Sequence, residues 1–415
     1  MTERSRVVIV GAGFAGLTAA RALKRAHVSV LLLDRVNFHT FTPLLYQVAS
    51  ALLDPSEIAH PVRDIVRPLR NVEARLAEVT AVDLHGRAVE TSAGRVAFNY
   101  LVLAAGSVNN FYGIEGMAEA SFGLKHLDQA LSLRNRILEQ FEKAAWAKDP
   151  RRRRALLTFA VVGGGPTGVE FTGAVQELIR NVLQKDFPEL DVAEARVVLV
   201  EAADHLLGAF DPKLREDALR RLERKGAEVL LRKEVKRVVR GRLELGDGEK
   251  IEAGTVIWTA GVKANDLARS LGLEAGKAAT VRVEPTLQLP GHPEAFAIGD
   301  MAYLEQGGQA LPMLIPVAMQ QARHVARAID GMTRGRAPRP FHYADPGMMA
   351  TIGRNAGIAQ LGPVRIDGFP GWLLWLGFHL LQIITLRAKL VVLVNWTWDY
   401  FFLDRPIRLL VRASR

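Results

Sequence analysis

Two short apolar runs, each followed at once by a cluster of glycines, stand out from the pattern of hydrophobic and polar positions. The first run covers residues 7–10 and the second covers residues 160–162. Both are too short for a helix and are rich in valine, which is typical of buried parallel strands. The glycines and the apolar residues after them predict a tight turn and the start of a helix. The chain is therefore predicted to contain two strand–turn–helix units of the kind that binds a dinucleotide.

The glycines of the first unit have the spacing that a dinucleotide requires. Gly11 allows the tight turn, Gly13 lets a pyrophosphate approach the backbone, and Gly16 lets the helix pack on the strand. The pyrophosphate would lie at the N-terminus of that helix, where backbone N–H groups point outward. The next predicted strand, residues 28–33, ends in Asp34, a carboxylate placed to accept a hydrogen bond from a ribose hydroxyl.

The second unit repeats this arrangement from Gly163 to Gly168. Its helix is longer, with residues 186–188 (Asp-Phe-Pro) as the predicted stop. The following strand, residues 196–200, ends in Glu201. A carboxylate there favours the 2′-hydroxyl of NAD(H), because it would repel the 2′-phosphate of NADP(H). We therefore expect two dinucleotides on one chain and electron transfer between them.

Further segments extend the two units. Residues 101–106 and 256–261 are near copies of one another, each an apolar strand followed by a turn of small residues, and so form an internal repeat. The short strand at 295–298 leads to Asp300, which either binds the ribityl or phosphate end of a flavin or caps the turn. A helix is predicted from Pro316 to about Ile329, with the positive end of its dipole at the start.

Residues 369–403 form an apolar segment that is rich in tryptophan. Arg387 and Lys389 divide it into halves of roughly 15 residues, shorter than the roughly 20 needed to cross a bilayer. Trp and Tyr prefer the headgroup boundary, and arginines suit anionic lipid. We expect two interfacial helices that lie on a membrane; a buried hairpin or dimer contact and a transmembrane segment are the alternatives. The residues that carry this prediction are Trp372, Trp375, Trp396, Trp398, Arg405, Arg408, Arg412 and Arg415.

Composition narrows the chemistry. The 415 residues allow two or three domains, and 49% of them are hydrophobic. The absence of cysteine excludes disulfides, thiolate metal sites, iron–sulfur clusters and Cys-x-x-Cys redox pairs. A net charge of +10 without a nucleic-acid motif favours anionic lipid as partner. The first strand starts too early to leave room for a signal peptide, and the basic run at residues 151–154 is interpreted as a solvated linker.

Together these features resemble the type II NADH:quinone dehydrogenases, single-subunit flavoenzymes of respiratory membranes, over nearly the whole length. Any one stretch alone would indicate only the wider superfamily of two-dinucleotide flavoproteins. That superfamily includes disulfide reductases and sulfide:quinone reductases, which need cysteines that this chain lacks. The stretches that carry the resemblance are residues 34–39, 43–49, 163–171, 258–262, 297–300 and 395–400.

These units and the resemblance imply an α/β fold of two Rossmann-like dinucleotide-binding domains, for FAD and NADH, plus a C-terminal membrane-associating helical segment. The expected bounds are residues 1–115 and 270–335 for the FAD domain, 116–269 for the NADH domain and 336–415 for the C-terminal region. The residues expected to bind FAD are Gly11, Gly13, Phe14, Ala15, Gly16, Asp34, Arg35, Asn37, Ala105, Gly106, Asp300, Val317 and Ala318. Those expected to bind NADH are Gly163, Gly165, Pro166, Thr167, Gly168, Glu201 and Gly261.

The resemblance also places Glu170 beside the nicotinamide as the expected catalytic residue; the alternative is an acid that merely favours the helix dipole. It makes residues 315–321 part of the wall between flavin and quinone. The chain departs from the family at Pro316 and Thr42, where the family usually or often has Gln, whereas Gln320 matches a second family Gln. The expected quinone contacts are Gln47, Pro316, Gln320 and His379, and no metal site is expected.

The expected function is FAD-dependent oxidation of NADH with transfer of two electrons to membrane quinone. No proton pumping is expected, because no acidic or histidine chain crosses a bilayer. The expected location is the cytoplasmic face of the cell membrane, as a peripheral protein, with no nucleic-acid partner and with a homodimer left open. Two alternatives remain: a reductase of the same fold with a soluble acceptor, and a flavin- and NADH-binding membrane sensor. Four tryptophans beside a basic terminus argue against the soluble reductase.

Overall fold

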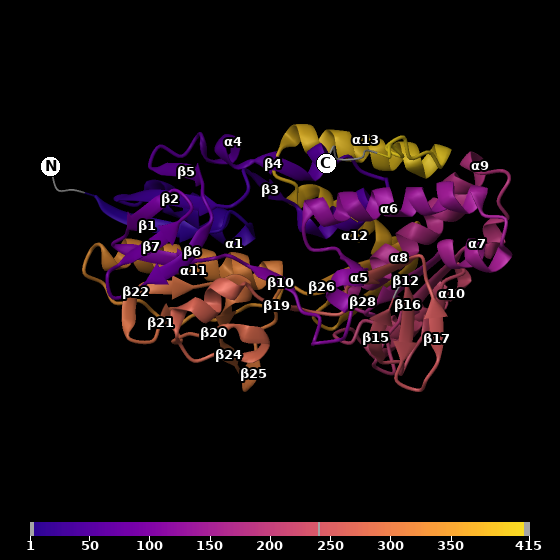
Figure 1. Cartoon of the computed structure of the whole chain (residues 1–415). Coiled ribbons are helices and arrows are strands. Elements are labelled where there is room, and N and C mark those ends of the chain that lie inside the picture. Colours follow the sequence, from indigo (N-terminus) through magenta and orange to yellow (C-terminus); the bar gives the residue numbers. More distant parts are fainter. Residues whose placement is uncertain (1–3, 240, 411–415) are drawn as a thin grey trace. The chain divides into compact units, whose positions relative to one another are not determined.

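The computed structural model describes residues 4–239 and 241–410, which divide into two compact units (Figure 1). Unit 1 is built from the residues up to Thr40, together with His60–Val108 and Val262–Asp345. Unit 2 is built from Phe41–Ala59, Asn109–Gly261 and the chain from Pro346 onward. Each unit therefore collects segments that are far apart in the sequence.

A six-stranded sheet forms the centre of unit 1. Its strands, in spatial order, are β21 (Gln288–Leu289), β22 (His292–Ala297), β9 (Tyr100–Leu103), β1 (Ser5–Val10), β2 (Val28–Asp34) and β5 (Val72–Leu76). β1 pairs in parallel with both β2 and β9. After β1 the chain forms α1 (Phe14–Ala22), which packs against α11 (Ile315–Met332). The turns after β1 and β9 meet at the carboxyl ends of the parallel strands, where such folds bind nucleotides.

Alternate residues of neighbouring strands face one core in unit 1, as the period of a strand requires. They are Val8, Val10, Leu31, Leu33, Leu101, Leu103, Ala295 and Ala297. An antiparallel sheet adds Val89 to the same core. That sheet and the smaller elements of this part of the chain are β6 (Val79–Asp83), β7 (Ala88–Thr91), β8 (Gly94–Ala97), β3 (Phe38–Thr40), β4 (Ala59–Pro61), α4 (Val62–Val66), β10 (Ser107–Asn109), β19 (Val262–Ala264), β20 (Val281–Arg282), β23 (Ala302–Tyr303), β24 (Glu305–Gln306) and β25 (Gln309–Ala310).

A five-stranded parallel sheet forms the centre of unit 2. Its strands, in spatial order, are β11 (Ser121–Gly123), β18 (Thr255–Trp258), β12 (Thr158–Val162), β13 (Arg196–Val200) and β14 (Glu228–Leu230). The strands β12, β13 and β18 correspond to β1, β2 and β9 of unit 1, so the repeat predicted from the sequence is confirmed. Both predicted strand–turn–helix units are present, and the chain has the expected α/β fold.

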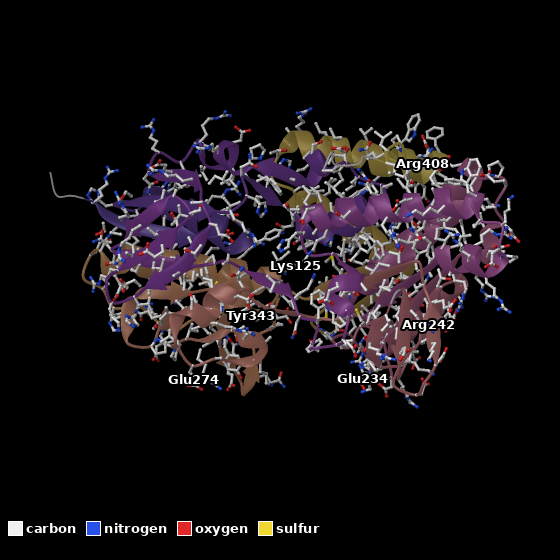
Figure 2. The ribbon with its side chains drawn as sticks, in the orientation of Figure 1. Lys125, Glu234, Arg242, Glu274, Tyr343 and Arg408 are labelled. Atoms are coloured by element: carbon white, nitrogen blue, oxygen red, sulfur yellow. The ribbon has the colours of Figure 1, made fainter. Side chains whose placement is uncertain are left out.

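Helices flank the sheet of unit 2. The helix after β12 runs as α8 (Pro166–Leu178), then through a π-helical turn to α9 (Gln184–Asp186), so the predicted stop near residue 186 is confirmed. The antiparallel strands β15 (Val235–Val239), β16 (Arg242–Leu245) and β17 (Lys250–Glu252) bury one side in the core of unit 2. Charged side chains at their surface include Arg242, and Glu234 just before β15 (Figure 2). The remaining helices are α2 (Leu45–Ala49), α3 (Pro55–Ile58), α5 (Met117–Ala120), α6 (Leu127–Trp146) and α10 (Pro212–Arg224).

The basic run at residues 151–154 lies in a helix, so its interpretation as a linker is wrong. It forms most of α7 (Pro150–Leu156), which Asp149 caps by accepting a hydrogen bond from the backbone of Arg151. Arg153 makes a two-pronged ion pair with Glu194, at 2.7 and 2.8 Å. These contacts fix the run to unit 2.

The last part of the described chain belongs to unit 2. A three-stranded sheet, β26 (Met348–Gly353), β27 (Ala356–Leu361) and β28 (Val364–Asp367), packs on α8. Two helices follow, α12 (Gly368–Gln382) and α13 (Leu386–Phe402), so the expected pair of C-terminal helices is present. No helix among the described residues is long and apolar enough to span a bilayer.

The unit boundaries differ from the expected domain boundaries in four places. Residues 41–59 and 109–115 join unit 2, and residues 262–269 join unit 1. The region expected at 336–415 is divided, because residues up to Asp345 belong to unit 1 and the following ones to unit 2. The C-terminal helices are therefore part of the same compact unit as the second glycine loop.

Candidate functional site

The first glycine loop has a backbone that only glycine allows at two positions. Gly11 has φ +103°, and an added Cβ would lie 2.3 Å from the carbonyl oxygen of Ala104 in the turn after β9. A Cβ at Gly16 would lie 1.8 Å from the carbonyl oxygen of Gly11. A Cβ at Gly13 would instead meet nothing within 4 Å. The loop is thus packed on its inner side and open at Gly13, beside an α1 N-terminus that has no side-chain cap.

The second glycine loop repeats this geometry in unit 2. Gly163 has φ +113°, and a Cβ there would lie 2.6 Å from Cα of Ala260, in the turn after β18. A Cβ at Gly168 would lie 1.9 Å from the carbonyl oxygen of Gly163, whereas Gly165 again faces open space. The residues Pro166 and Thr167 are exposed in the first turn of α8, which also lacks a side-chain cap.

Each strand-end acid is bound to its own glycine loop. Asp34 accepts hydrogen bonds from the backbone N–H of Ala12 at 2.6 Å and of Val36 at 2.9 Å. Glu201 accepts from the backbone N–H of Gly164 at 2.5 Å and of Ala203 at 2.7 Å. In both units one oxygen holds the loop and the other holds the turn after the strand. The carboxylate is therefore fixed at the edge where a ribose would lie.

Several predicted flavin-binding residues gather in unit 1 around the start of α11. The backbone N–H of Ala105 donates to the sulfur of Met301 at 3.2 Å, and the hydroxyl of Ser107 donates to Asp300. The amide oxygen of Gln321, which is 1% exposed, accepts from the backbone N–H of Gly299 at 2.7 Å. Gly106 lies in the turn after β9, and Val317 and Ala318 lie in the first turn of α11. Sequence analysis missed Gln321, although a buried amide on an apolar helix face is itself a signal.

The segment after β2 contains a further residue that sequence analysis did not select. His39 is buried, its Nδ1 lies 3.0 Å from the carbonyl oxygen of Ala12, and its ring packs edge-on against Phe14 at 4.9 Å. Burial lowers the pKa of His39 to about 4, so the ring is neutral at pH 7. The predicted residues Arg35 and Asn37 are exposed just before it. His39 thus packs against the first loop and against Phe14, one of the predicted FAD contacts.

Two residues of the turn after β18, Thr259 and Gly261, lie beside the second glycine loop or the ring of Tyr112. The hydroxyl of Thr259 donates towards the carbonyl oxygens of Val162 and Gly163, at 2.9 and 3.0 Å. A Cβ at Gly261 would lie 2.3 Å from the hydroxyl of Tyr112. Glycine is therefore needed here to leave room for the ring of Tyr112. Sequence analysis named Gly261 but not Thr259, whose hydroxyl ties β18 to the loop.

Glu170 is a buried carboxyl group on α8. Its Oε1 accepts hydrogen bonds from the backbone N–H of Thr351 at 3.2 Å and from the indole Nε1 of Trp375 at 3.1 Å. Burial raises the pKa of Glu170 to about 8 and outweighs these two hydrogen bonds, which lower it. At pH 7 the group is therefore mostly protonated. A strongly shifted carboxyl group on a nucleotide-binding helix is a functional-site candidate.

Glu170 lines a cavity of about 60 Å³ that lies within unit 2. Residues from the second glycine unit, the segment 41–59 and the C-terminal elements form its walls. The lining residues are Tyr46, Gln47, Leu52, Glu170, Ala174, Glu177, Thr351, Gly353, Arg354, Trp372, Trp375, Leu376, Trp396, Asp399, Tyr400 and Arg405. This polar lining and volume suit a few water molecules.

The four predicted quinone contacts fall in different units. Gln47 and His379 belong to unit 2, and Pro316 and Gln320 belong to unit 1. The amide of Gln47 donates to the hydroxyl of Tyr46 at 2.9 Å and accepts from Trp396 at 2.8 Å. His379 stacks on Trp375 with ring centroids 4.1 Å apart, and burial lowers its pKa to about 4.

In unit 1, Pro316 lies in the first turn of α11 and leaves the backbone there without a donor. Gln320 makes two hydrogen bonds to the backbone of Ala344, at 2.7 and 3.1 Å. Its amide therefore anchors the segment after residue 341 to α11.

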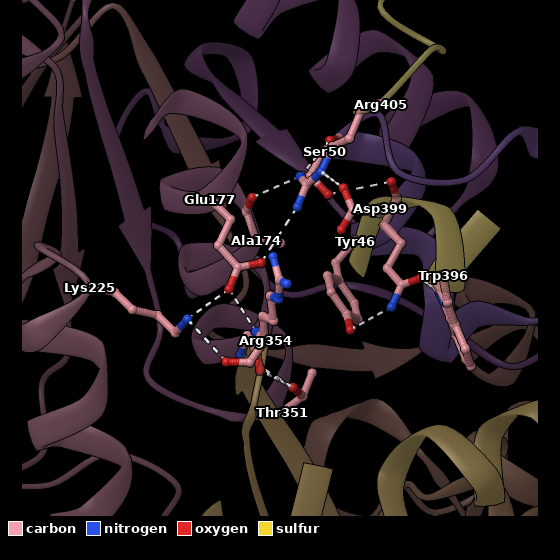
Figure 3. A network of polar contacts seen from close by, with 12 residues as sticks. Tyr46, Ser50, Ala174, Glu177, Lys225, Thr351, Arg354, Trp396, Asp399 and Arg405 are labelled. Atoms are coloured by element: carbon pink, nitrogen blue, oxygen red, sulfur yellow. Dashed lines mark hydrogen bonds and ion pairs between the residues drawn. The ribbon is translucent and has the colours of Figure 1, made fainter. Parts of the chain in front are cut away.

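Arg405 is buried in unit 2, so the expectation that it faces lipid is wrong. Its side chain is 2% exposed and donates to the carbonyl oxygens of Ser50 and Ala174, at 3.0 and 3.1 Å (Figure 3). It also pairs with Glu177 at 3.5 Å and Asp399 at 3.3 Å. The tail is thus pinned to α2 and α8. Arg408 pairs with Asp186 at 2.7 Å, and Arg412 and Arg415 lie outside the described residues.

The four tail tryptophans do not share one environment. Trp375 and Trp396 are 1% and 9% exposed and donate to groups inside unit 2, so they are not lipid-facing. Trp372 is partly buried against Tyr400, and Trp398 is half exposed. The opposite side of the two helices is apolar and exposed. It consists of Phe369, Leu373, Phe378, Leu381, Leu386, Leu390, Val391, Leu393, Val394, Trp398, Phe401 and Phe402, here called the tail face.

Metal ligands do not gather anywhere in the described part of the chain. Residues 4–239 and 241–410 contain no group of three or more His, Asp or Glu side chains arranged to hold a metal ion.

Comparison with known proteins gives consistent similarities. A family model described as pyridine nucleotide-disulphide oxidoreductase matches residues 5–322. The type II NADH:quinone oxidoreductase Ndh of Mycobacterium tuberculosis is 41% identical over 410 residues, which cover 95% of this chain and 88% of that protein. The type II NADH:quinone oxidoreductase NdhA of the same organism is 38% identical over 95% of this chain and 86% of that protein.

A solved structure gives the same result for the fold. NDH2 from Plasmodium falciparum, solved in complex with NADH, superposes on this chain with a TM-score of 0.89. The match covers 99% of this chain and 100% of the NDH2 chain. Its sequence identity is 17%, so this similarity concerns the fold alone.

Proposed function

The chain belongs to the type II NADH:quinone oxidoreductases, within the pyridine nucleotide-disulphide oxidoreductase family, and we propose that it oxidises NADH through FAD and reduces membrane quinone without pumping protons. The family expected from the sequence is thereby confirmed. The observation that best supports this activity is that the glycine loop occurs twice, each time with a strand-end carboxylate bound to it, Asp34 or Glu201. Each loop with its carboxylate is here called a cradle. A chain built for one nucleotide would need only one such cradle.

Unit 1 fits the FAD. The open space at Gly13 and the uncapped N-terminus of α1 suit a pyrophosphate, and Asp34 suits a ribose hydroxyl. Asp300 and the N-terminal turn of α11, at Val317 and Ala318, suit the rest of the cofactor. Bound FAD supplies the chemistry that accepts a hydride from NADH and returns two electrons to quinone.

Unit 2 fits NADH by the same argument. Gly165 is open, α8 starts without a side-chain cap, and Glu201 is fixed at the strand end. A 2′-phosphate beside this carboxylate would suffer like-charge repulsion, so NADH is the preferred coenzyme. The expected domain roles follow, with unit 1 for FAD and unit 2 for NADH.

Glu170 is the proposed catalytic residue beside the nicotinamide. Its neutral form at pH 7 can donate a hydrogen bond, and its buried position excludes bulk water from the reacting end of NADH. Gln47, Pro316, Gln320 and His379 remain the proposed quinone contacts. The amides of Gln47 and Gln320 are each hydrogen-bonded within their own unit, to Trp396 and to the backbone of Ala344.

The tail face is the proposed membrane contact. Burying one of its Leu, Val or Phe side chains contributes about 1.5–3 kcal/mol, so several together hold a peripheral protein on a bilayer. This face supports peripheral attachment, and the location that we propose is the cytoplasmic face of the cell membrane. A second copy of the chain could cover part of the same face as a homodimer.

Steady-state oxidation of NADH, measured with and without a quinone in liposomes, tests the proposal. The expected result is an FAD-containing protein whose NADH oxidation depends on quinone. Activity with a soluble acceptor but none with quinone would replace it by a soluble-acceptor reductase. A protein that binds FAD and NADH without turning over with either acceptor would instead be a sensor.

A further inference from the structure

The carboxyl group of Glu170 is held asymmetrically. Both hydrogen bonds that it makes go to Oε1, one from the backbone of Thr351 and one from the indole of Trp375. Among the described residues, none donates a hydrogen bond to Oε2. Two N–H donors on one oxygen favour that oxygen as the carbonyl oxygen of the neutral acid. Oε2 is therefore the oxygen that carries the proton.

Trp375 is well placed to impose this arrangement. Its side chain is 1% exposed and packs against the rings of His379 and Trp396, with centroid distances of 4.1 and 6.0 Å. The hydroxyl-bearing ring of Tyr46 lies edge-on at 6.2 Å. These aromatic contacts fix the indole plane, so the direction of its N–H is set by packing rather than by Glu170.

The charged side chains around this cavity interact with one another or with an aromatic ring rather than with Glu170. Glu177 pairs with Lys225 at 2.7 Å, and Arg405 lies between Glu177 and Asp399. The guanidinium of Arg354 lies 4.2 Å above the ring of Tyr400.

Two uncharged groups complete the surroundings of Glu170. Burial raises the pKa of Tyr46 well above its usual value, and that of His379 is lowered to about 4, so both are neutral at pH 7. Burial and two hydrogen bonds, rather than any opposite charge, therefore control the proton on Glu170.

We propose that Trp375 is a positioning residue for NADH oxidation, and that its indole N–H holds Oε1 of Glu170 so that Oε2 is the oxygen that gains and loses the proton. The proposal rests on the proposed function, in which Glu170 lies beside the nicotinamide. It assigns a role in the reaction to α12, a helix that otherwise belongs to the membrane-associating tail. Trp375 itself touches no reacting atom.

The first test replaces the indole donor by Trp375→Phe in the full-length, FAD-loaded protein. Infrared spectra record the carbonyl stretch of protonated Glu170, identified as the band that Glu170→Gln removes. Loss of one donor to the carboxylate form should raise the midpoint of this titration by about one pH unit. The same shift should appear in the pH profile of kcat/KM for NADH, with FAD content unchanged.

Trp396→Phe is the matched control. It removes another buried indole N–H from the same cavity, but that N–H donates to Gln47 at 2.8 Å rather than to Glu170. The Glu170 midpoint should stay at the wild-type value in this variant. In a Glu170→Gln background, Trp375→Phe should move no pH midpoint. An unchanged or lowered midpoint in Trp375→Phe would overturn the proposal.

A second measurement uses the wild-type protein, and so does not depend on the folding of the variant. The indole groups are labelled with ¹⁵N, and each signal is assigned by its absence in a single Trp→Phe variant or by elimination. The Trp375 indole signal should move with the titration of Glu170, and the Trp396 signal should not. A Trp375 signal that stays constant while Glu170 titrates would contradict the hydrogen bond. These spectra need no substrate, so their outcome is independent of the NADH:quinone assay.

Discussion

The guanidinium group of Arg405 donates a hydrogen bond to the backbone carbonyl of Ala174, 231 residues earlier in the chain. Ala174 lies on α8, one turn after Glu170 and one turn before Glu177, which the same arginine pairs with. The helix that begins at the second glycine loop is thus bonded along one side to the segment after α13. The second glycine loop and the C-terminal tail are therefore bonded parts of unit 2.

Arg405→Ala should destabilise the protein by about 3–5 kcal/mol, because it removes the ion-pair partner of Asp399 and one of the two cations that pair with Glu177 at the buried cavity. The measurement is thermal unfolding of the FAD-loaded protein. Arg408→Ala is the control, since its pair with Asp186 is partly exposed and should contribute about 0–1 kcal/mol. Equal effects of the two substitutions would contradict the buried network.

Gly13→Ala and Gly165→Ala should separate the two cofactors. Both positions have open space for a Cβ and ordinary φ angles, so the folded state should tolerate the change. The added methyl group would instead occupy the space of a pyrophosphate. We expect Gly13→Ala to lower FAD content, and Gly165→Ala to keep FAD but raise KM for NADH at least about tenfold.

A cofactor titration followed by steady-state kinetics measures both effects. Gly168→Ala serves as the contrasting variant, because its Cβ would lie 1.9 Å from a backbone carbonyl oxygen and should prevent folding of unit 2. If Gly13→Ala retained full FAD, the first loop would not be the pyrophosphate site.

Glu201→Gln should reduce the preference for NADH over NADPH. The wild-type carboxylate repels a 2′-phosphate, and removal of one charge is worth on the order of 1.4 kcal/mol, a tenfold change in the ratio of kcat/KM values. Asp204→Asn is the control, since it removes an exposed charge three residues later without touching the glycine loop. A ratio that stays the same in Glu201→Gln would mean that this side chain does not face the ribose.

Glu170→Gln should stabilise the protein more as the pH rises. Folded Glu170 holds its proton up to about pH 8, whereas the unfolded chain releases it near the usual pKa of 4.5. Between these values the folded state binds more protons, so wild-type stability falls with rising pH. The variant has a neutral amide that does not titrate, so its free energy of unfolding lacks this pH-dependent decrease. The Tm of Glu170→Gln minus that of the wild type should therefore grow by several degrees between about pH 5 and about pH 8.

The matching control is Glu73→Gln, which makes the same change at an exposed acid of unit 1 and should leave Tm close to the wild-type value. In stopped-flow experiments, Glu170→Gln should also slow the reduction of FAD by NADH or weaken NADH binding, with FAD content unchanged. Wild-type kinetics would limit Glu170 to a structural part of α8.

Charges on the tail face should release the protein from membranes. Leu390→Glu with Val394→Glu changes two side chains that are 55% and 63% exposed, so the fold should be preserved. Co-sedimentation with anionic liposomes should fall at least about tenfold, since each buried apolar side chain contributes about 1.5–3 kcal/mol. Leu76→Glu is the control, at a 60% exposed leucine outside the tail. Reduction of FAD by NADH should survive in both variants.

The sequence predicted the two cradles well because their chemistry is local. Gly11, Gly16, Gly163 and Gly168 have spacings that follow from one tight turn and one helix, and the acids Asp34 and Glu201 come directly after their strands. The helix end at residue 186 could be predicted for the same reason, from a single proline. Such features depend on neighbours within about 40 residues.

The tail could be predicted only as a pair of helices. Both α12 and α13 are apolar on nearly all sides, so no hydrophobic stripe indicates which side faces the protein. The side that buries Trp375 and Trp396 is set by Glu170 and Gln47, which lie far away in the sequence. Arg405 was misassigned to lipid for the same reason, since its carboxylate and carbonyl partners are distant.

The position of these partners has a consequence for how the protein is synthesised. Unit 2 begins to emerge from the ribosome with Phe41, but the groups that close its cavity, Trp375, Trp396 and Arg405, emerge more than 300 residues later. At about 5–20 residues per second, the α8 carboxyl groups wait tens of seconds for their partners. All the segments of unit 1 leave the ribosome before that point. The second glycine loop thus reaches its final surroundings only after the rest of the nucleotide-binding structure has been made.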